Sequence, residues 1–349
     1  MQHELKASRL SSAAAQKGLL FGTALCNSDL RLQPLVQTIL RDCNIITPEY
    51  EMKWDAVSQN PGGPDYSAAD ELMAFSSANG LAFHGHTLWW HEAIPAALRN
   101  TSGKRFIKAA LDHLQTTVTR YAGRLHSWDV VNEPLEPAHD RKDGLRETPF
   151  VAAFGPDYIE AAFRQASLLD PSAVLLLNEM GLEYASPAAE RKRRRMLALL
   201  ERELAKETPI DCLGIQSHLT ALEQPRDHPE LRTFLREIRD LGLSVMITEM
   251  DVSDHLCPRD RKQRDSIVAD TYRGYLDLVL DEAKVLAVST WCLSDNRTWL
   301  NGFRPRPDGA PQRSLLLDRA NRRKPAWHAV KAAFLNERQA ASHPVEASP

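Results

Sequence analysis

Eight apolar runs of strand length recur along the chain at fairly regular spacing, and segments with helical periodicity separate them. The runs lie at residues 19–25, 44–47, 81–87, 127–136, 173–178, 212–217, 243–248 and 286–291. An alternation of strand and helix repeated eight times is the pattern of parallel strands wound into a closed barrel. We therefore predict the α/β class and a single (β/α)8 TIM barrel.

Local signals mark some of the intervening helices. Residues 67–70 (Ser-Ala-Ala-Asp) have the pattern of a capping box that opens a helix, which residues 79–80 (Asn-Gly) would close. Residues 156–157 (Pro-Asp) precede an amphipathic run that ends at Asp170. These signals predict one helix after the second strand and another before the fifth.

The chain shows no internal division. Its 349 residues suit one large barrel, and no linker rich in Pro, Gly or Ser separates one part from another. We expect a catalytic barrel domain at residues 11–337 with flexible tails at 1–10 and 338–349.

Composition and charge exclude several kinds of partner. Hydrophobic residues make up 43% of the chain, charged residues 26%, and the formal net charge is −3. No apolar run approaches the length that spans a membrane, so we expect no membrane anchor, and the charge indicates no nucleic-acid partner. The basic run 191–195 is predicted to be a solvated helix face between Glu190 and Glu201.

The five cysteines are widely spread, with no Cys-x-x-Cys pair, and indicate neither a disulfide framework nor a zinc site. Four of them lie in or beside apolar runs, so we expect small buried hydrophobic side chains. The first residues, Met-Gln-His-Glu-Leu-Lys, lack the apolar segment of a secretory signal. Either the protein stays inside the cell or its signal has been removed.

Polar and aromatic residues follow the buried run of almost every predicted strand. In a barrel these strand ends converge on one face, where barrel enzymes keep their chemistry. Sugars require such a surface, because their flat faces stack on tryptophan and their hydroxyls need paired donors and acceptors. The candidate residues are Glu49, Lys53, His86, Trp90, Asn132, Glu133, Asn178, Gln216, His218, Glu249, Asp251, Trp291 and Trp299.

Two carboxylates stand out among these strand ends. Glu133 ends the fourth predicted strand within an Asn-Glu-Pro sequence, and Glu249 ends the seventh. A single glutamate in such a place is most often a solvated loop residue, but a pair at two strand ends favours acid/base and nucleophilic chemistry. The chain has no His-Glu-x-x-His motif, phosphate loop or Gly-x-Ser-x-Gly elbow, so we predict no metal.

With these residues assembled, the chain resembles the family 10 glycoside hydrolases, which are endo-β-1,4-xylanases. The resemblance runs from residues 21–24 (Phe-Gly-Thr-Ala) to residues 324–327 (Lys-Pro-Ala-Trp). Its motifs occur in the order of the family: Glu-Met-Lys-Trp at 51–54, Gly-His-Thr-Leu at 85–88, Trp-Asp-Val-Val-Asn-Glu at 128–133, Gln-Ser-His at 216–218 and Ile-Thr-Glu at 247–249.

The resemblance implies a retaining endo-1,4-β-xylanase that acts on xylan and xylo-oligosaccharides without a cofactor, with Glu133 as general acid/base and Glu249 as nucleophile. It implies that Asn132 bonds the 2-hydroxyl of the reacting sugar, and that His218 holds the nucleophile with Asp251 behind it. The positions that it places on the glycone side and at the cleavage point are Glu49, Lys53, His86, Trp90, Gln216, Trp291 and Trp299, and Asn178 joins them as a supporting residue.

The paired carboxylates have a physical logic of their own. One carboxyl group must be protonated to donate to the leaving oxygen, while the other must be ionised to attack the anomeric carbon. In retaining enzymes the two groups lie about 5–5.5 Å apart and push their pKa values in opposite directions. Formation of the neutral glycosyl ester removes this repulsion, so the acid of the first step can serve as the base of the second.

The chain also departs from the family pattern. Tyr50 stands where the family usually has Asn, Ala93 where it has Gln, and Leu177 or Met180 where an aromatic platform is common. These departures predict altered sugar binding around a normal catalytic centre. The family resemblance also implies a monomer that is secreted or periplasmic, with a cytoplasmic location as the alternative.

Other functions are compatible with the same residues. A cellulase-like retaining β-glycanase of the same clan shares the Asn-Glu-Pro sequence, although the motifs at 51–54 and 216–218 argue against it. A non-catalytic carbohydrate-binding barrel would have lost a carboxylate, and both Glu133 and Glu249 are present. A transglycosylase would use the same intermediate, and the difference is only whether water or a second sugar accepts the glycosyl group.

Overall fold

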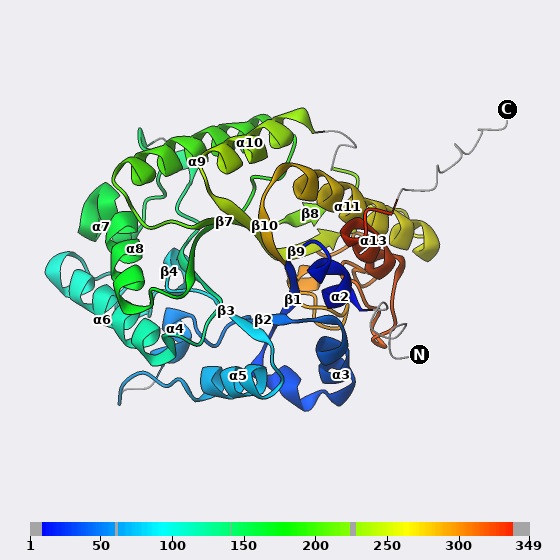
Figure 1. The fold of residues 1–349 in the computed structure, drawn as a ribbon, viewed down its shortest axis with the longest axis horizontal. Helices are drawn as coiled ribbons and strands as arrows, with labels where there is room; N and C mark the ends of the chain where they lie inside the picture. Colours follow the sequence, from blue (N-terminus) through cyan, green and yellow to red (C-terminus); the bar gives the residue numbers. More distant parts are fainter. Residues whose placement is uncertain (1–8, 60–61, 140, 224–227, 338–349) are drawn as a thin grey trace.

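The protein is a closed barrel of eight parallel strands surrounded by helices (Figure 1). The computed structural model describes residues 9–59, 62–139, 141–223 and 228–337. Around the barrel the strand order is β10-β1-β2-β3-β5-β6-β7-β9, and pairing between β9 and β10 closes it. All eight predicted strands are therefore confirmed, together with the predicted fold class.

Two short strands extend this barrel at the carboxyl ends of its strands. β4 pairs with the end of β5, and β8 pairs with the end of β9, which continues beyond the barrel. The strands are β1 (Leu20–Leu25), β2 (Ile45–Pro48), β3 (Ala82–Gly85), β4 (Trp89–Trp90), β5 (Ser127–Asn132), β6 (Val174–Glu179), β7 (Cys212–Ile215), β8 (His218–Thr220), β9 (Ser244–Ser253) and β10 (Val285–Thr290).

The helices lie on the outside of the barrel (Figure 1), and many of their apolar residues belong to the main hydrophobic core. In α10 the buried residues are Leu231, Phe234, Leu235 and Ile238, whose spacing places them on one stripe of the helix. The helices are α2 (Leu10–Ala15), α3 (Gln33–Asp42), α4 (Trp54–Val57), α5 (Ser67–Ala78), α6 (Gly103–Tyr121), α7 (Pro149–Phe154), α8 (Tyr158–Leu169), α9 (Pro187–Ala205), α10 (Pro229–Asp240), α11 (Arg261–Glu282), α12 (Leu300–Phe303) and α13 (Pro325–Phe334). Short 3-10 helices are η1 (Asn27–Arg31), η2 (His91–Ala93), η3 (Pro137–His139) and η4 (Gly155–Asp157).

The two helices predicted from local signals are present as α5 and α8, but the predicted capping box of α5 is wrong. Tyr66 precedes the helix, and no side chain caps it. The backbone N–H of Ser67 donates to Asp65 Oδ1 at 2.9 Å, and Asp70 accepts hydrogen bonds from Arg120 and Tyr121 of α6. A neighbouring carboxylate and two tertiary partners therefore take the groups that the capping box would have paired.

The limits of the domain differ from the prediction at one end. Leu10, which the sequence places in the N-terminal tail, is buried at the start of α2 and belongs to the main hydrophobic core. The rest of that tail up to residue 8 and the predicted tail at 338–349 lie outside the described residues. None of the helices in the described part of the chain has the length and apolar character needed to cross a membrane.

The interior of the barrel changes from apolar to polar along its axis. Ile45, Leu176, Cys212, Met246 and Ala287, from five of the strands, form a small separate core inside the barrel. Further along the strands, buried polar side chains replace apolar ones, as at Asn178 of β6 and Thr248 of β9. The apolar core therefore supports a polar floor at the carboxyl ends of the strands.

Candidate active site

The barrel brings the predicted site residues from the ends of seven of its eight strands, and from the short strands β4 and β8, to one face. Asn132, Asn178, Glu249 and Asp251 lie within β5, β6 and β9 near their carboxyl ends. The other candidates follow or belong to neighbouring segments at the same face: Glu49 and Lys53 after β2, His86 after β3, Trp90 in β4, Glu133 after β5, Gln216 after β7, His218 in β8, and Trp291 and Trp299 after β10.

Glu249 lies in a network that keeps it ionised. Its Oε1 accepts a hydrogen bond from Asn178 Nδ2 at 2.9 Å, and its Oε2 lies 3.4 Å from His218 Nε2. Burial acts to raise the pKa of Glu249, but the hydrogen bond with His218 and the electrostatic effects of His86 and His218 outweigh it, so the pKa lies below its ordinary value. The carboxylate is therefore in the form required of a nucleophile.

His218 is held in turn from its other side. Its Nδ1 lies 3.1 Å from Asp251 Oδ1, and Trp299 Nε1 donates to Asp251 Oδ2 at 2.7 Å. Burial acts to lower the pKa of His218, but Asp251 and Glu249 outweigh burial and raise this pKa well above its ordinary value. A protonated imidazole thus bridges the two carboxylates and orients Glu249.

Glu133 is fixed by its backbone as well as by its side chain. Its φ angle of 55° is in the left-handed region that glutamate rarely adopts. The backbone N–H donates to the carbonyl of Asn178 at 2.8 Å, and Arg146 Nε donates to the carbonyl of Glu133 at 3.1 Å. Gln216 Nε2 donates to Glu133 Oε1 at 3.0 Å. This strained conformation, held by several partners, is characteristic of functional residues.

Three amide side chains connect Glu133 to Glu249. Gln216 Nε2 lies 3.0 Å from Glu133 Oε1 and 3.4 Å from Asn132 Oδ1, and Asn178 Nδ2 donates to both Asn132 Oδ1 and Glu249 Oε1 at 2.9 Å. We call Asn132, Asn178 and Gln216 the amide network. It places the two carboxylates, from strands on different sides of the barrel, within one hydrogen-bonded cluster.

Asn178 can take this position because the adjacent strand carries a glycine. A Cβ on Gly214 of β7 would lie 2.3 Å from Asn178 Oδ1, closer than any real contact. Thr248 Oγ1 donates to the same Oδ1 at 2.8 Å, which settles the orientation of the amide and directs its Nδ2 at Glu249.

His86 belongs to a second buried network that sequence reasoning missed. Asp129 Oδ2 lies 2.8 Å from His86 Nδ1 and 3.0 Å from His84 Nε2. Burial acts to raise the pKa of Asp129, but the two histidines lower it to about 2. An ionised Asp129 can only accept, so Nδ1 of His86 carries a proton. A charged residue inside the buried run of a strand was the signal that could have indicated Asp129 in advance.

The aromatic candidates surround Lys53 and the histidines. Lys53 Nζ lies 4.7 Å from the ring centroid of Trp90 and 5.8 Å from that of Trp291. Trp291 makes an edge contact with His86 at 5.3 Å, and Trp299 makes one with His218 at 5.1 Å. Burial lowers the pKa of Lys53, whereas Glu249 and Glu49 act to raise it. Lys53 is therefore a half-buried amine whose pKa is set by the balance between burial and the carboxylates of Glu249 and Glu49.

The positions that depart from the family pattern have different surroundings. Tyr50 is 42% exposed, and its ring lies 6.0 Å from Lys53 Nζ. Ala93 is buried in η2, where its methyl group offers no polar contact. Leu177 is buried in β6, whereas Met180 is 38% exposed directly after that strand, so Met180 is the residue at the platform position. Trp89 is buried against Phe150 and presents almost no surface to solvent.

The predicted solvated face at residues 191–195 is wrong for two of its members. Arg193 is buried and donates to the carbonyls of Leu182 and Tyr184. Lys192 Nζ lies 2.8 Å from Glu179 Oε1, and the other oxygen of this buried carboxylate accepts from the N–H of Leu135 at 3.0 Å. The ion pair between Lys192 and Glu179 therefore supports the segment that follows Glu133. The composition of residues 191–195 alone indicates a fully solvated helix face.

We predict that Lys192→Met destabilises the protein by about 3 kcal/mol at neutral pH, because it leaves the carboxylate of Glu179 buried and unpaired. Burial already raises the pKa of Glu179. Loss of the Lys192 cation raises the pKa of Glu179 further. The loss in free energy of unfolding is therefore full at pH values above this pKa, and it shrinks as the pH falls and Glu179 is protonated. Urea unfolding at several pH values measures both effects.

Arg194→Ala is the matched control for this prediction. Arg194 is on the same helix and pairs with Glu190 at 2.8 Å, but its side chain is 63% exposed. Its removal should change the free energy of unfolding by no more than about 0.5 kcal/mol. Equal losses for the two variants would contradict a buried structural ion pair at Lys192.

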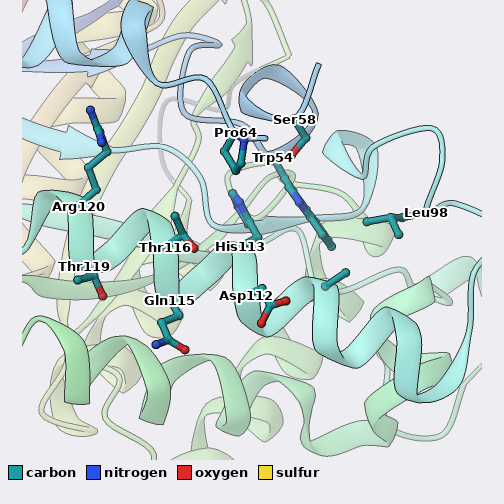
Figure 2. A pocket seen from close by; sticks show the side chains of 11 residues that line it. Trp54, Ser58, Pro64, Leu98, Asp112, His113, Gln115, Thr116, Thr119 and Arg120 are labelled. Atoms are coloured by element: carbon teal, nitrogen blue, oxygen red, sulfur yellow. The ribbon is translucent and has the colours of Figure 1, made fainter. Parts of the chain in front are cut away.

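A separate pocket lies between α4 and α6, away from these residues (Figure 2). Trp54 and His113 stack in its wall with ring centroids 5.0 Å apart, and polar side chains of α6 such as Gln115 and Thr119 complete its lining. None of the predicted site residues lines it. In the described ranges, no group of three or more histidine, cysteine or acidic side chains could hold a metal ion.

Comparisons with known proteins find similarity over most of the chain. The family model described as "Glycosyl hydrolase family 10" matches residues 9–333. Endo-1,4-beta-xylanase A of Fusarium oxysporum f. sp. lycopersici is 30% identical over 88% of this chain and 92% of its own length. Endo-1,4-beta-xylanase C of Paenibacillus barcinonensis is 31% identical over 93% of this chain, which spans about a third (31%) of that longer protein.

A solved structure shows the same architecture. The crystal structure of xylanase 10B from Thermotoga petrophila RKU-1 in complex with xylobiose superposes with a TM-score of 0.82. The two chains are 28% identical, and the match covers 94% of this chain and 97% of the other. The structural match therefore extends over nearly the whole barrel and is not limited to the strand ends that carry the candidate residues.

Proposed function

Because the chain belongs to glycosyl hydrolase family 10, a family of retaining hydrolases that act on xylan, we propose that Glu133 and Glu249 cleave internal β-1,4-xylosidic bonds. The protein is an endo-1,4-β-xylanase of this family. The observation that carries the assignment of roles is the amide network, which joins the two carboxylates through Asn178 and Gln216.

In the first step, an oxygen of Glu249 forms a bond to the anomeric carbon while the bond to the leaving oxygen breaks. Glu133 gives its proton to that oxygen, and an ester links the sugar to Glu249. In the second step, Glu133 takes a proton from water, the water oxygen bonds to the anomeric carbon, and Glu249 leaves as a carboxylate. Two inversions retain the β configuration.

The surrounding residues support each stage of this reaction. The positive charge of His218 stabilises Glu249 as an anion before attack. Asn132 is placed by Asn178 to meet a sugar hydroxyl beside the reacting carbon, and Lys53 with His86 provides donors on the glycone side. Tryptophans 90, 291 and 299 offer apolar surfaces to the sugar faces.

Product analysis tests this function directly. Purified protein is incubated with glucuronoxylan and with xylo-oligosaccharides, and proton NMR at early times follows the anomeric configuration of the products. Short products that are first released as β anomers are expected. Faster cleavage of carboxymethylcellulose than of xylan would instead indicate a cellulase-like β-glycanase, and binding without cleavage a non-catalytic barrel.

Tyr50→Asn is predicted to change sugar affinity more than stability. The Tyr50 ring is 42% exposed, and its hydroxyl accepts one hydrogen bond, from Gln59 Nε2 at 3.3 Å, so its removal should shift Tm by less than about 2 °C. An asparagine amide beside Lys53 supplies both a donor and an acceptor for sugar hydroxyls, and a change in KM of about three-fold is expected.

The measurement is KM for an aryl xylobioside together with a thermal melt. Gln59→Ala is the control, because it removes the partner of the hydroxyl and leaves residue 50 unchanged. An unchanged KM with a large fall in Tm would mean that Tyr50 is a structural residue.

The oligomeric state and the cellular location of the enzyme are also proposed. We propose that the enzyme acts as a monomer outside the cytoplasm, since its substrate is a polymer that cells meet externally. The five cysteines are free thiols, so the structure depends on no disulfide among them. Light scattering of the purified protein and fractionation of the producing cell test the two assignments.

A further inference from the structure

Glu49 holds an unusual position among the site residues because two thiols point at one of its oxygens. Cys26 Sγ lies 3.1 Å from Glu49 Oε2, and Cys292 Sγ lies 3.5 Å from the same atom. Cys26 follows β1, Glu49 follows β2 and Cys292 follows β10, three strands that are neighbours in the barrel. Closure of the barrel thus brings the two cysteines together over one carboxylate.

Both thiols act as donors in this cluster. Burial and the negative charge of Glu49 raise the pKa of Cys26 and that of Cys292 well above the ordinary value of a thiol. Each sulfur therefore keeps its hydrogen, and each S–H can donate to the carboxylate of Glu49. The two contacts occupy Oε2 and leave Oε1 as the oxygen that can accept from a sugar hydroxyl.

The backbone holds each cysteine in place. Cys292 is buried, with a φ angle of 69°, in the left-handed region where glycine is the favoured residue. The N–H of Cys26 donates to Asp29 Oδ2 at 2.9 Å, and Arg297 Nε lies 2.9 Å from Asp29 Oδ1. Cys292 thus occupies a backbone position suited to glycine while its thiol contacts the carboxylate of Glu49. Such a strained backbone often marks a functional residue.

We propose that Cys26 and Cys292 are positioning residues that orient Glu49 toward the sugar unit next to the reacting one on the glycone side. Glu49 stands outside the amide network that joins Glu133 to Glu249, on the β10-β1-β2 arc of the barrel. The thiols therefore act on the binding of a second sugar and only weakly on bond cleavage. This inference rests on the proposed function, because it requires a xylan chain in the cleft.

The first test compares two aryl glycosides that differ by one sugar. An aryl xyloside fills only the reacting position, whereas an aryl xylobioside also reaches the neighbouring one. For the double variant Cys26→Ala/Cys292→Ala, KM for the xylobioside should rise about five-fold more than KM for the xyloside, with kcat changed less than KM. The double variant Cys26→Ser/Cys292→Ser keeps two donors and should recover most of the affinity.

Coupling to Glu49 separates positioning from a general structural role. In a Glu49→Ala background the same cysteine changes should have no further effect on KM, because the group they orient is gone. If the effects of the cysteine and glutamate changes add in full, the inference is overturned. Cys43→Ala is the matched control, since Cys43 is also buried but lies at the amino end of β2, away from the cleft.

Cys292→Gly gives a readout that a structural role would not produce. Glycine relieves the left-handed backbone while removing the thiol, so Tm should be no lower than that of the wild type although KM for the xylobioside rises. A fall in Tm with unchanged KM would overturn the inference. If the wild type cleaves neither glycoside, the proposed function fails, and calorimetric binding of xylobiose to the same variants decides the inference on its own.

Discussion

Glu249→Ala should lower the turnover of xylan and of aryl xylosides alike by at least about 10⁴-fold. Without this carboxylate no ester can form at the anomeric carbon, and a good leaving group does not compensate for the missing nucleophile. Glu249→Gln should be equally inactive, although it retains the volume and an oxygen for the hydrogen bond from Asn178. The measurement is initial rate on both substrate types, with Tm recorded to confirm folding.

Addition of azide sharpens this test. In Glu249→Ala a small anion can enter the space of the lost side chain. From there it attacks the anomeric carbon of an aryl β-xyloside on the face opposite the leaving group, where the Glu249 carboxylate would have attacked. This single displacement inverts the configuration, so the expected product is the α-xylosyl azide. A β-xylosyl azide from this variant would place the nucleophile at another residue.

Glu133→Ala should affect substrates according to their leaving groups. An aryl xyloside with an acidic phenol needs little protonation, so formation of its glycosyl-enzyme should be largely spared, whereas xylan should lose about 10²–10⁴-fold in rate. The second step lacks its base, and the glycosyl-enzyme should accumulate as a burst of phenol followed by slow turnover. Stopped-flow release of the phenol measures both phases.

The same variant responds to azide with the opposite stereochemistry. The ester on Glu249 is attacked by an anion that needs no base, which gives the β-xylosyl azide and restores steady turnover. Gln216→Ala serves as a comparison, because it removes the donor at 3.0 Å from Glu133 but keeps the carboxyl group. Equal losses of Glu133→Ala on xylan and on activated aryl xylosides would contradict its role as the acid.

The barrel and the position of the two candidate carboxylates could be predicted because their signals are local. A buried parallel strand is a short apolar run, and a polar residue directly after it lies at the carboxyl end, whichever strand it follows. Glu133 and Glu249 were found in this way, and all eight strands lie where the runs predicted them. By contrast, β4 and β8 are two and three residues long, too short for any periodicity to indicate.

Pattern reasoning failed where another partner competes for the same group. Ser67 and Asp70 have the sequence of a capping box, but Asp65 takes the N–H of Ser67 and Arg120 binds Asp70 across the fold. The basic run 191–195 has the composition of a solvated face, yet Lys192 pairs with the buried Glu179. The fold brings Arg120 to Asp70 and Glu179 to Lys192, whereas Asp65 competes for Ser67 from only two residues away.

The sequence by itself determined the strand positions, the order of the motifs and the two carboxylates, because periodicity and backbone preference act over a few residues. Only the tertiary structure decided that Asn178 bridges Asn132 and Glu249, and that Cys26 and Cys292 share Glu49 although Glu49 and Cys292 are 243 positions apart. The closed barrel creates such contacts by bringing the ends of strands that are distant in sequence to one face, and no local rule contains that geometry.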